Sequence, residues 1–242
     1  MPNLLLIPNV LAPDTQHTHL PTLVQDVVKE TQVFFVEELR TARRFISSLK
    51  LGLTIEDLHF EQLNKNTSYE EVKRLFAKYK NQDIGIISEA GCPCIADPGS
   101  LASLAAHELG YKVVALPGPS SIFMALMASG FNGQQFTFHG YLNVKKDQKL
   151  KDLKRLQTLA EHGTQIFMET PYRNNAMLED LIKTLAPSMY LSIAVDITSK
   201  NELVITKSIS EWKKLGSLPG IHKRPTIFLL KSNPKLLSSR SK

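Results

Sequence analysis

Short apolar runs of strand type alternate with amphipathic segments of helical period through the first half of the chain. The strand candidates are residues 4–7, 33–36, 84–87 and 113–116, and the helix candidates are residues 20–29, 39–49, 68–80 and 101–109. Ser68 and Glu71 have the spacing of a capping box at one helix start, and Gly110 is a stop signal after another helix. Strands that alternate with helices are typical of a mainly parallel sheet with helices on both faces.

The second half of the chain is richer in strands. Its strand candidates are residues 136–141, 165–168, 189–195, 202–209 and 226–230, and its helix candidates are residues 175–185 and the basic segment 145–155. The rigid turn Pro117-Gly118-Pro119 separates the two patterns. We therefore predict an α/β fold with two domains. Residues 1–117 would form a mainly parallel sheet with helices on both faces, residues 118–231 a mixed sheet with helices, and residues 232–242 a basic tail.

Composition excludes several classes of protein. The chain has 242 residues, of which 43% are hydrophobic, and no apolar run approaches the roughly 20 residues that cross a bilayer. The first eight residues lack the basic start of a signal peptide and favour a buried first strand, so we expect a cytoplasmic protein without membrane contact. The only cysteines, Cys92 and Cys94, are too few for a disulfide framework or a cysteine-rich metal site, and the histidines form no ligand pattern. We expect reduced thiols and no metal.

The net charge permits an anionic partner without requiring one. Lysine and arginine outnumber aspartate and glutamate by 29 to 23, which gives a formal charge of +6. Six basic residues fall within positions 145–155. This segment indicates either a contact with nucleic acid or an ordinary solvated helix face.

Motifs of the common nucleotide-binding and hydrolytic sites are absent from the sequence: G-x-G-x-x-G after the first strand, G-x-x-x-x-G-K-[ST], G-x-S-x-G and H-E-x-x-H. Three strand-to-helix junctions stand out instead, at residues 88–99, 117–121 and 169–173. In open α/β sheets, ligands bind at the loops that follow the strands. Each junction taken alone is equally consistent with a rigid turn, a helix cap or a local ion pair.

The order of these junctions resembles the tetrapyrrole-methylase superfamily, and in particular its branch of ribosomal-RNA ribose methyltransferases. That branch reads S-D-A-G-x-P-x-I-x-D-P-G, then P-G-P-S, then F-x-G-[FY] before a basic helix, then E-[ST]-P-x-R. Here the corresponding segments are residues 88–99, 117–120, 138–141 and 169–173. The resemblance covers nearly the whole chain, from the first strand to about Leu230.

The resemblance implies two α/β domains, S-adenosylmethionine in the cleft between them, a homodimer, and ribosomal RNA or the small ribosomal subunit as substrate. Family positions carried over residue by residue imply cofactor contacts at Pro8, Glu89, Gly91, Cys92, Pro93, Ser121, Ile122, Met168, Ala194 and Thr226. They also imply catalytic candidates at Glu38, Arg40, Lys145 and Arg173. Methyl transfer to a ribose hydroxyl would use these as a general base or as cations that stabilise the developing oxyanion.

The chain also departs from the branch pattern. The first loop, Pro8-Asn9-Val10-Leu11, lacks the glycine of the family's P-T-P-I-G-N, and Glu37-Glu38-Leu39-Arg40 stands where the family has E-D-T-R. Glu89 replaces an aspartate and Tyr172 a histidine. Three classes of function therefore stay open: an RNA ribose methyltransferase, a methylase of a tetrapyrrole, another small molecule or a protein side chain, and a cofactor-binding module without catalysis.

Overall fold

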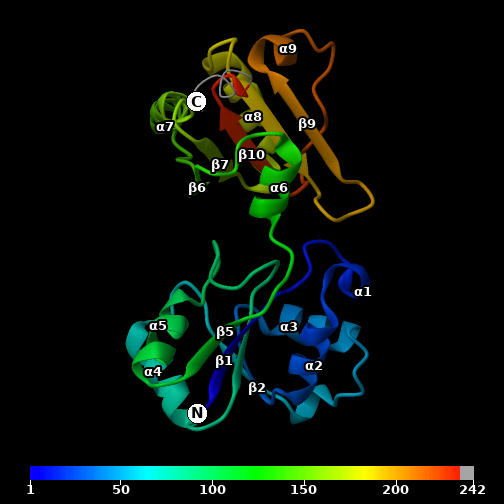
Figure 1. The fold of residues 1–242 in the computed structure, drawn as a ribbon, viewed down its shortest axis with the longest axis vertical. Coiled ribbons are helices and arrows are strands. Elements are labelled where there is room, and N and C mark those ends of the chain that lie inside the picture. The colour runs from blue at the N-terminus through cyan, green and yellow to red at the C-terminus, as the bar shows by residue number, and fades with distance from the viewer. Residues whose placement is uncertain (235–242) are drawn as a thin grey trace, which may run out of the picture. The chain divides into compact units, whose positions relative to one another are not determined.

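The computed structural model describes residues 1–234 and divides into two compact units, Met1–Ser120 and the residues from Ser121 onward (Figure 1). Each unit is built on its own five-stranded sheet. The predicted basic tail, residues 232–242, lies outside the described residues from position 235 on.

The first unit contains a parallel sheet in the order β3-β2-β4-β1-β5. Its elements are β1 (Asn3–Ile7), α1 (Gln16–His19), α2 (Thr22–Glu30), β2 (Val33–Val36), α3 (Leu39–Ser48), a 3-10 turn (Ile55–Asp57), β3 (His59–Gln62), α4 (Tyr69–Lys78), β4 (Ile84–Ile87), α5 (Ser100–Glu108) and β5 (Lys112–Ala115). The predicted parallel sheet is confirmed. The capping box at the start of α4 is confirmed too, because the Ser68 hydroxyl accepts a hydrogen bond from the backbone N–H of Glu71 and the Glu71 carboxylate bonds back to Ser68.

Successive residues of β2 show how the sheet is covered on both faces. Phe35 points into a cluster with Phe76 of α4 and Ala105 of α5, whereas Phe34 points into a second cluster with Val28 of α2 and Ile46 of α3. Neighbouring strand residues face opposite sides, so a continuous apolar run is what a sheet buried on both faces requires. Figure 1 shows α4 and α5 on one side of this sheet and α2 and α3 on the other.

The second unit contains a mixed sheet in the order β6-β7-β10-β8-β9, in which only β6 and β7 are parallel. Its elements are α6 (Ser121–Ser129), β6 (Phe136–Tyr141), α7 (Lys146–Leu159), β7 (Thr164–Met168), a 3-10 turn (Pro171–Arg173), α8 (Asn174–Thr184), β8 (Tyr190–Val195), β9 (Leu203–Ser208), α9 (Ile209–Lys213) and β10 (Thr226–Lys231). The predicted mixed sheet is confirmed.

The core of the second unit lies between its sheet and the helices α7, α8 and α9. Phe167 of β7 stacks on Phe228 of β10 with ring centroids 5.4 Å apart, and the Trp212 indole N–H of α9 donates to the Leu191 carbonyl at 3.0 Å. Lys231 at the end of β10 is buried as well, and its ammonium donates to the Ala160 carbonyl at 3.1 Å, beyond the last turn of α7. A cation at that position is favoured by the partial negative charge of a helix C-terminus.

Candidate functional site

The loops that follow β1 and β4 are joined beyond the end of the first sheet. Asn9 and Gly91 exchange two backbone hydrogen bonds, and the Asn9 side-chain amide donates to the Ser88 and Glu89 carbonyls at 3.0 and 3.1 Å. Its Oδ1 atom accepts from the backbone N–H of Val10 at 2.7 Å. Asn9 is 3% exposed, so these bonds are largely shielded from water and hold the two loops together.

The turn that follows β5 packs against the same place. A Cβ atom on Gly118 would lie 2.2 Å from Cβ of Pro8, which no side chain can tolerate. Gly91 has φ +70°, and a Cβ atom there would meet Leu11 Cδ2 at 3.1 Å and the Pro119 carbonyl oxygen at 3.3 Å. Glycine at both positions lets three loops approach one another at the carboxyl ends of the strands, where open α/β folds bind ligands.

The motif loop after β4, residues 88–99, is held in an unusual backbone conformation. Cys94 and Ala96 both have positive φ, at 68° and 66°. The thiol of Cys92 lies 3.5 Å from the Pro119 carbonyl oxygen, and the thiol of Cys94 lies 3.5 Å from the Ser103 hydroxyl. Both cysteines are free, and burial raises the pKa of both thiols. Left-handed non-glycine residues cost free energy and are concentrated at binding and catalytic sites.

Three carboxylates lie near the carboxyl ends of these strands: Glu37 after β2, Glu89 after β4, and Asp97 in the motif loop. Burial, followed by repulsion from Glu37 and Glu89, raises the pKa of Asp97 to about 6. Burial and repulsion from Glu89 also raise the pKa of Glu37, whose Oε2 atom is buried without a hydrogen-bond partner. The Ser88 hydroxyl is likewise buried without one. Within residues 1–234, no group of three or more His, Cys, Asp or Glu side chains is arranged to hold a metal ion.

The predicted catalytic residues Glu38 and Arg40 lie at the end of β2. The Glu38 carboxylate caps α3 and accepts a hydrogen bond from the backbone N–H of Arg40 at 3.3 Å. Both side chains are exposed, so they stay accessible to a large substrate.

In the second unit, the segment that follows β7 holds a buried carboxylate. Glu169 Oε1 lies 2.6 Å from a guanidinium nitrogen of Arg173 and accepts from the backbone N–H of Thr170 at 2.6 Å. The Glu169 side chain is 3% exposed and the Arg173 side chain is 42% exposed. Arg173 Nε and Asn174 Oδ1 are buried without a hydrogen-bond partner. This predicted catalytic arginine is therefore anchored by an ion pair at one nitrogen, while its side chain stays partly exposed.

Two of the predicted cofactor residues in this unit share a rung of the sheet. Met168 of β7 and Ala194 of β8 both pair with Ile227 of β10, so their side chains lie on one face, while Thr226 points to the opposite face. The Thr226 hydroxyl donates to the Arg224 carbonyl at 2.9 Å. Ser121 and Ile122 form the first turn of α6, where backbone N–H groups lack partners within the helix.

The basic helix of the second unit is only partly free for a partner. Lys149 forms an ion pair with Asp180 of α8, whereas Lys145 and Lys146 are exposed just before and at the start of α7. Lys151, Lys154 and Arg155 are exposed farther along α7, so Lys149 is the one basic residue of this segment that is held by an ion pair within the described residues.

Comparison with known proteins identifies the family. The family model of the tetrapyrrole (corrin/porphyrin) methylases matches residues 16–213. The chain belongs to this family.

Among tetrapyrrole methylases, the chain is similar to proteins named ribosomal RNA small subunit methyltransferase I. It is 31% identical to the protein of Bacillus subtilis over 186 residues, 77% of this chain and 61% of that relative. It is 33% identical to the protein of Escherichia coli O157:H7 over 150 residues, 62% of this chain and 52% of that relative. The chain thus spans between about half and two thirds of the length of these curated relatives.

Solved structures of other methyltransferases share the fold. The methyltransferase CobJ superposes with a TM-score of 0.62 at 14% identity, covering 96% of this chain and 95% of that one. Uroporphyrin-III C-methyltransferase from Thermus thermophilus, complexed with S-adenosyl homocysteine, gives 0.53 at 15% identity, covering 97% and 99%. At such identities the likeness shows the fold alone.

Several residues of this edge have no counterpart in the sequence prediction. Asn9 was not among the predicted site residues because a polar residue after a strand usually marks an ordinary turn. Glu37 and Asp97 are far apart in sequence, and only the parallel order of β2 and β4 brings their loops together.

No helix among the described residues is long and apolar enough to span a membrane.

Proposed function

We propose that the protein transfers a methyl group from S-adenosylmethionine to a ribose 2′-hydroxyl of small-subunit ribosomal RNA. The observation that carries this proposal is that the family motifs meet at the carboxyl ends of the strands of the first sheet. The loop after β4 and the turn after β5 contact the loop after β1 at Asn9 and Pro8. The choice of substrate is supported by the similarity to the small-subunit methyltransferases of Bacillus subtilis and Escherichia coli.

The residues at the edge of the first unit fit a ligand that carries positive charge. S-adenosylmethionine carries a positive sulfonium and a positive ammonium group. The carboxylates of Glu37, Glu89 and Asp97 would attract these charges. The buried, unpartnered hydroxyl of Ser88 would gain a hydrogen-bond partner in a complex. We propose that Pro8, Glu89, Gly91, Cys92 and Pro93 contact the cofactor in this unit.

The proposed cofactor contacts in the second unit are the two residues at the start of α6 and three strand residues. Met168 and Ala194 offer apolar side chains on one face of the sheet, as an adenine ring requires. The remaining residues are Ser121, Ile122 and Thr226.

When bound, S-adenosylmethionine supplies an electrophilic methyl group. The residues of the chain must place the ribose 2′-oxygen in line with that methyl group. They must also accept the proton of the 2′-hydroxyl, because a neutral hydroxyl is a weak nucleophile. We assign proton removal to the exposed Glu38 carboxylate and stabilisation of the developing negative oxygen to Arg40. Lys145, which is exposed, and Arg173, which is partly exposed, are proposed to bind RNA phosphates.

Comparison of ribosomal RNA from cells with and without this protein tests the proposal. Nucleoside mass spectrometry of purified small-subunit RNA should show the loss of a 2′-O-methylated nucleoside in the deletion strain and its return on complementation. An unchanged nucleoside profile would contradict the proposed substrate.

We also propose that the protein is cytoplasmic and that it is a homodimer, and the homodimer is what the family resemblance implies. Light scattering of the purified protein at micromolar concentration should give twice the mass of one chain. A monomer at that concentration would contradict the assembly but not the activity.

A further inference from the structure

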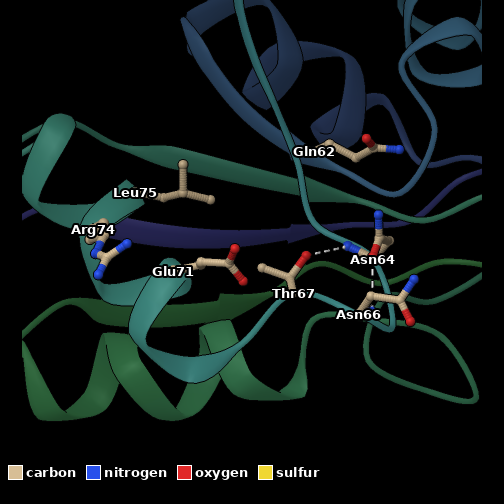
Figure 2. A pocket seen from close by; sticks show the side chains of 7 residues that line it. All are labelled: Gln62, Asn64, Asn66, Thr67, Glu71, Arg74 and Leu75. Carbon is tan, nitrogen blue, oxygen red and sulfur yellow. Dashed lines mark hydrogen bonds between the residues drawn. The ribbon is translucent and has the colours of Figure 1, made fainter.

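The carboxyl end of the edge strand β3 opens into a pocket that is lined mostly by polar residues and has a volume of about 460 Å³. We call this the β3 pocket. Its volume lies within the range of sites that bind small molecules or single nucleotides. Figure 2 shows amide groups of the loop after β3 at one end of the pocket and side chains of α4 at the other. The lining residues are Gln62, Asn64, Asn66, Thr67, Glu71, Arg74 and Leu75.

Hydrogen bonds within the loop hold the pocket in shape. The backbone N–H of Asn64 donates to the Thr67 hydroxyl at 3.0 Å, and the backbone N–H of Asn66 donates to Asn64 Oδ1 at 2.9 Å. The side-chain amide of Asn66 has no hydrogen-bond partner within the described part of the chain, and the same is true of Asn64 Nδ2. A fixed loop therefore presents unused donors and acceptors to solvent.

The β3 pocket adjoins the end of β2, where the proposed catalytic residues lie. The Gln62 amide lines the pocket and also donates to the Glu37 carbonyl at 3.2 Å, and Gln62 pairs with Val36 in the sheet. Glu38 and Arg40 follow within four residues of Val36. A ligand in the β3 pocket would therefore lie near the proposed catalytic residues Glu38 and Arg40.

We propose that the β3 pocket binds one RNA nucleotide next to the methylated one and so positions the substrate. This inference rests on the proposed function. Asparagine and glutamine amides offer a donor and an acceptor side by side, which matches the edge of a nucleobase, and single-stranded RNA exposes such edges. Arg74 can stack on a base or contact its phosphate, and Leu75 provides an apolar surface.

The charge of the β3 pocket argues for a nucleotide rather than a tetrapyrrole. Its single cation, Arg74, is balanced by Glu71, which interacts with it electrostatically. A tetrapyrrole with several carboxylates would need several cations. A pocket without excess charge fits a nucleotide that is held mainly through its neutral base, with at most one phosphate contact from Arg74.

The variants Asn66→Ala and Arg74→Ala test the subsite, because neither side chain supports the fold of the loop. The measurements are methyl incorporation into small-subunit ribosomal RNA transcribed in vitro, binding of the same RNA by fluorescence anisotropy, and S-adenosylmethionine binding by calorimetry. Loss of a base contact should raise the KM for RNA about tenfold, with kcat within about twofold and unchanged cofactor affinity.

Matched controls are Lys65→Ala in the same loop and Lys73→Ala on α4. Both remove a charge beside the pocket, but neither side chain lines it. Both should leave the KM for RNA within about twofold of wild type.

The outcomes separate the subsite from the proposed function. If the wild-type protein methylates the RNA and the pocket variants match it in KM and affinity, the subsite is wrong and the function stands. If the controls raise KM as much as the pocket variants, the effect is one of surface charge and the subsite is also wrong. If the wild-type protein neither binds nor methylates the RNA, both proposals are overturned.

Discussion

Asn9 and Gly91 exchange two backbone hydrogen bonds, with N···O distances of 2.9 and 3.1 Å, beyond the end of the first sheet. These bonds tie the loop after β1 to the motif loop after β4. The first of these loops, Pro8-Asn9-Val10-Leu11, contains no glycine. The buried Asn9 side chain stabilises the junction through bonds to the Ser88 and Glu89 carbonyls.

Replacing Asn9 by alanine should therefore destabilise the protein and weaken cofactor binding together. The buried Ser88 carbonyl, the partly buried Glu89 carbonyl and the N–H of Val10 would lose a partner, so the free energy of unfolding should fall by about 2 kcal/mol. Urea denaturation and calorimetry with S-adenosylmethionine measure the two effects. Asn3→Ala is a matched control, because the exposed Asn3 amide bonds only to Asp83 and its loss should cost less than about 1 kcal/mol. Cofactor affinity equal to wild type in Asn9→Ala would contradict this role.

Asp97 gives a prediction about pH. Its pKa is raised to about 6, so the folded protein holds a proton that the unfolded chain releases, and this residue lowers stability as pH rises from about 4 to about 6. Asp97→Asn should accordingly stabilise the protein by about 1 kcal/mol above pH 6, after allowance for partial solvent screening, and by little near pH 4. Chemical denaturation across this range measures it. An equal effect at pH 4 and pH 8 would show that the charge is not the cause.

The same substitution should reduce affinity for S-adenosylmethionine, because it removes one of three negative charges at the proposed cofactor site. A gain in stability accompanied by a loss of binding is expected where charge is held for function. Unchanged cofactor affinity at pH 8 would place Asp97 outside the site.

Arg173→Ala should destabilise the second unit, since it leaves the buried Glu169 carboxylate with only the backbone N–H of Thr170. The expected loss is about 1 to 2 kcal/mol, below the value for fully buried pairs because Arg173 is partly exposed. Arg155→Ala, which removes an exposed arginine of α7, should change stability by less than about 0.5 kcal/mol. Equal stabilities for the two variants would contradict the structural part of the Arg173 role.

The start of α7 gives a prediction about salt. Lys145→Glu combined with Lys146→Glu should lower RNA affinity and reduce the log–log salt slope by about 0.7 to 0.9 for each lost phosphate contact. Cofactor affinity should stay unchanged. Lys213→Glu with Lys214→Glu, at the exposed end of α9, makes the same change of charge elsewhere in this unit. RNA affinity reduced equally by both pairs would mean that only net charge matters.

The strands and most helices were predictable because their apolar residues repeat with the period of a strand or a helix. Both continuous runs, such as Val33–Val36, and alternating segments, such as Phe136–Tyr141, form strands as expected. The edge strand β3 was missed because His59–Gln62 is polar and largely exposed, and its pairing depends on β2 rather than on its own sequence. The short helices α1 and α9 lack the length for a visible period.

The candidate site was predictable only in part, because its motif loops are local in sequence whereas the contacts between them are not. The motif loops could be recognised in order, and the structure places those after β1, β4 and β5 at one edge. The carboxylate cluster and the β3 pocket depend on contacts between segments distant in sequence, such as the bond from Gln62 to the Glu37 carbonyl. No local pattern encodes such contacts.

Incubation of the purified protein with S-adenosylmethionine and small-subunit ribosomal RNA transcribed in vitro tests the central proposal most directly. Nucleoside mass spectrometry of the product should reveal one 2′-O-methylated ribonucleoside that is absent without cofactor. Methylation of a base instead of a ribose, or no methylation of an RNA that the protein demonstrably binds, would contradict the proposed reaction.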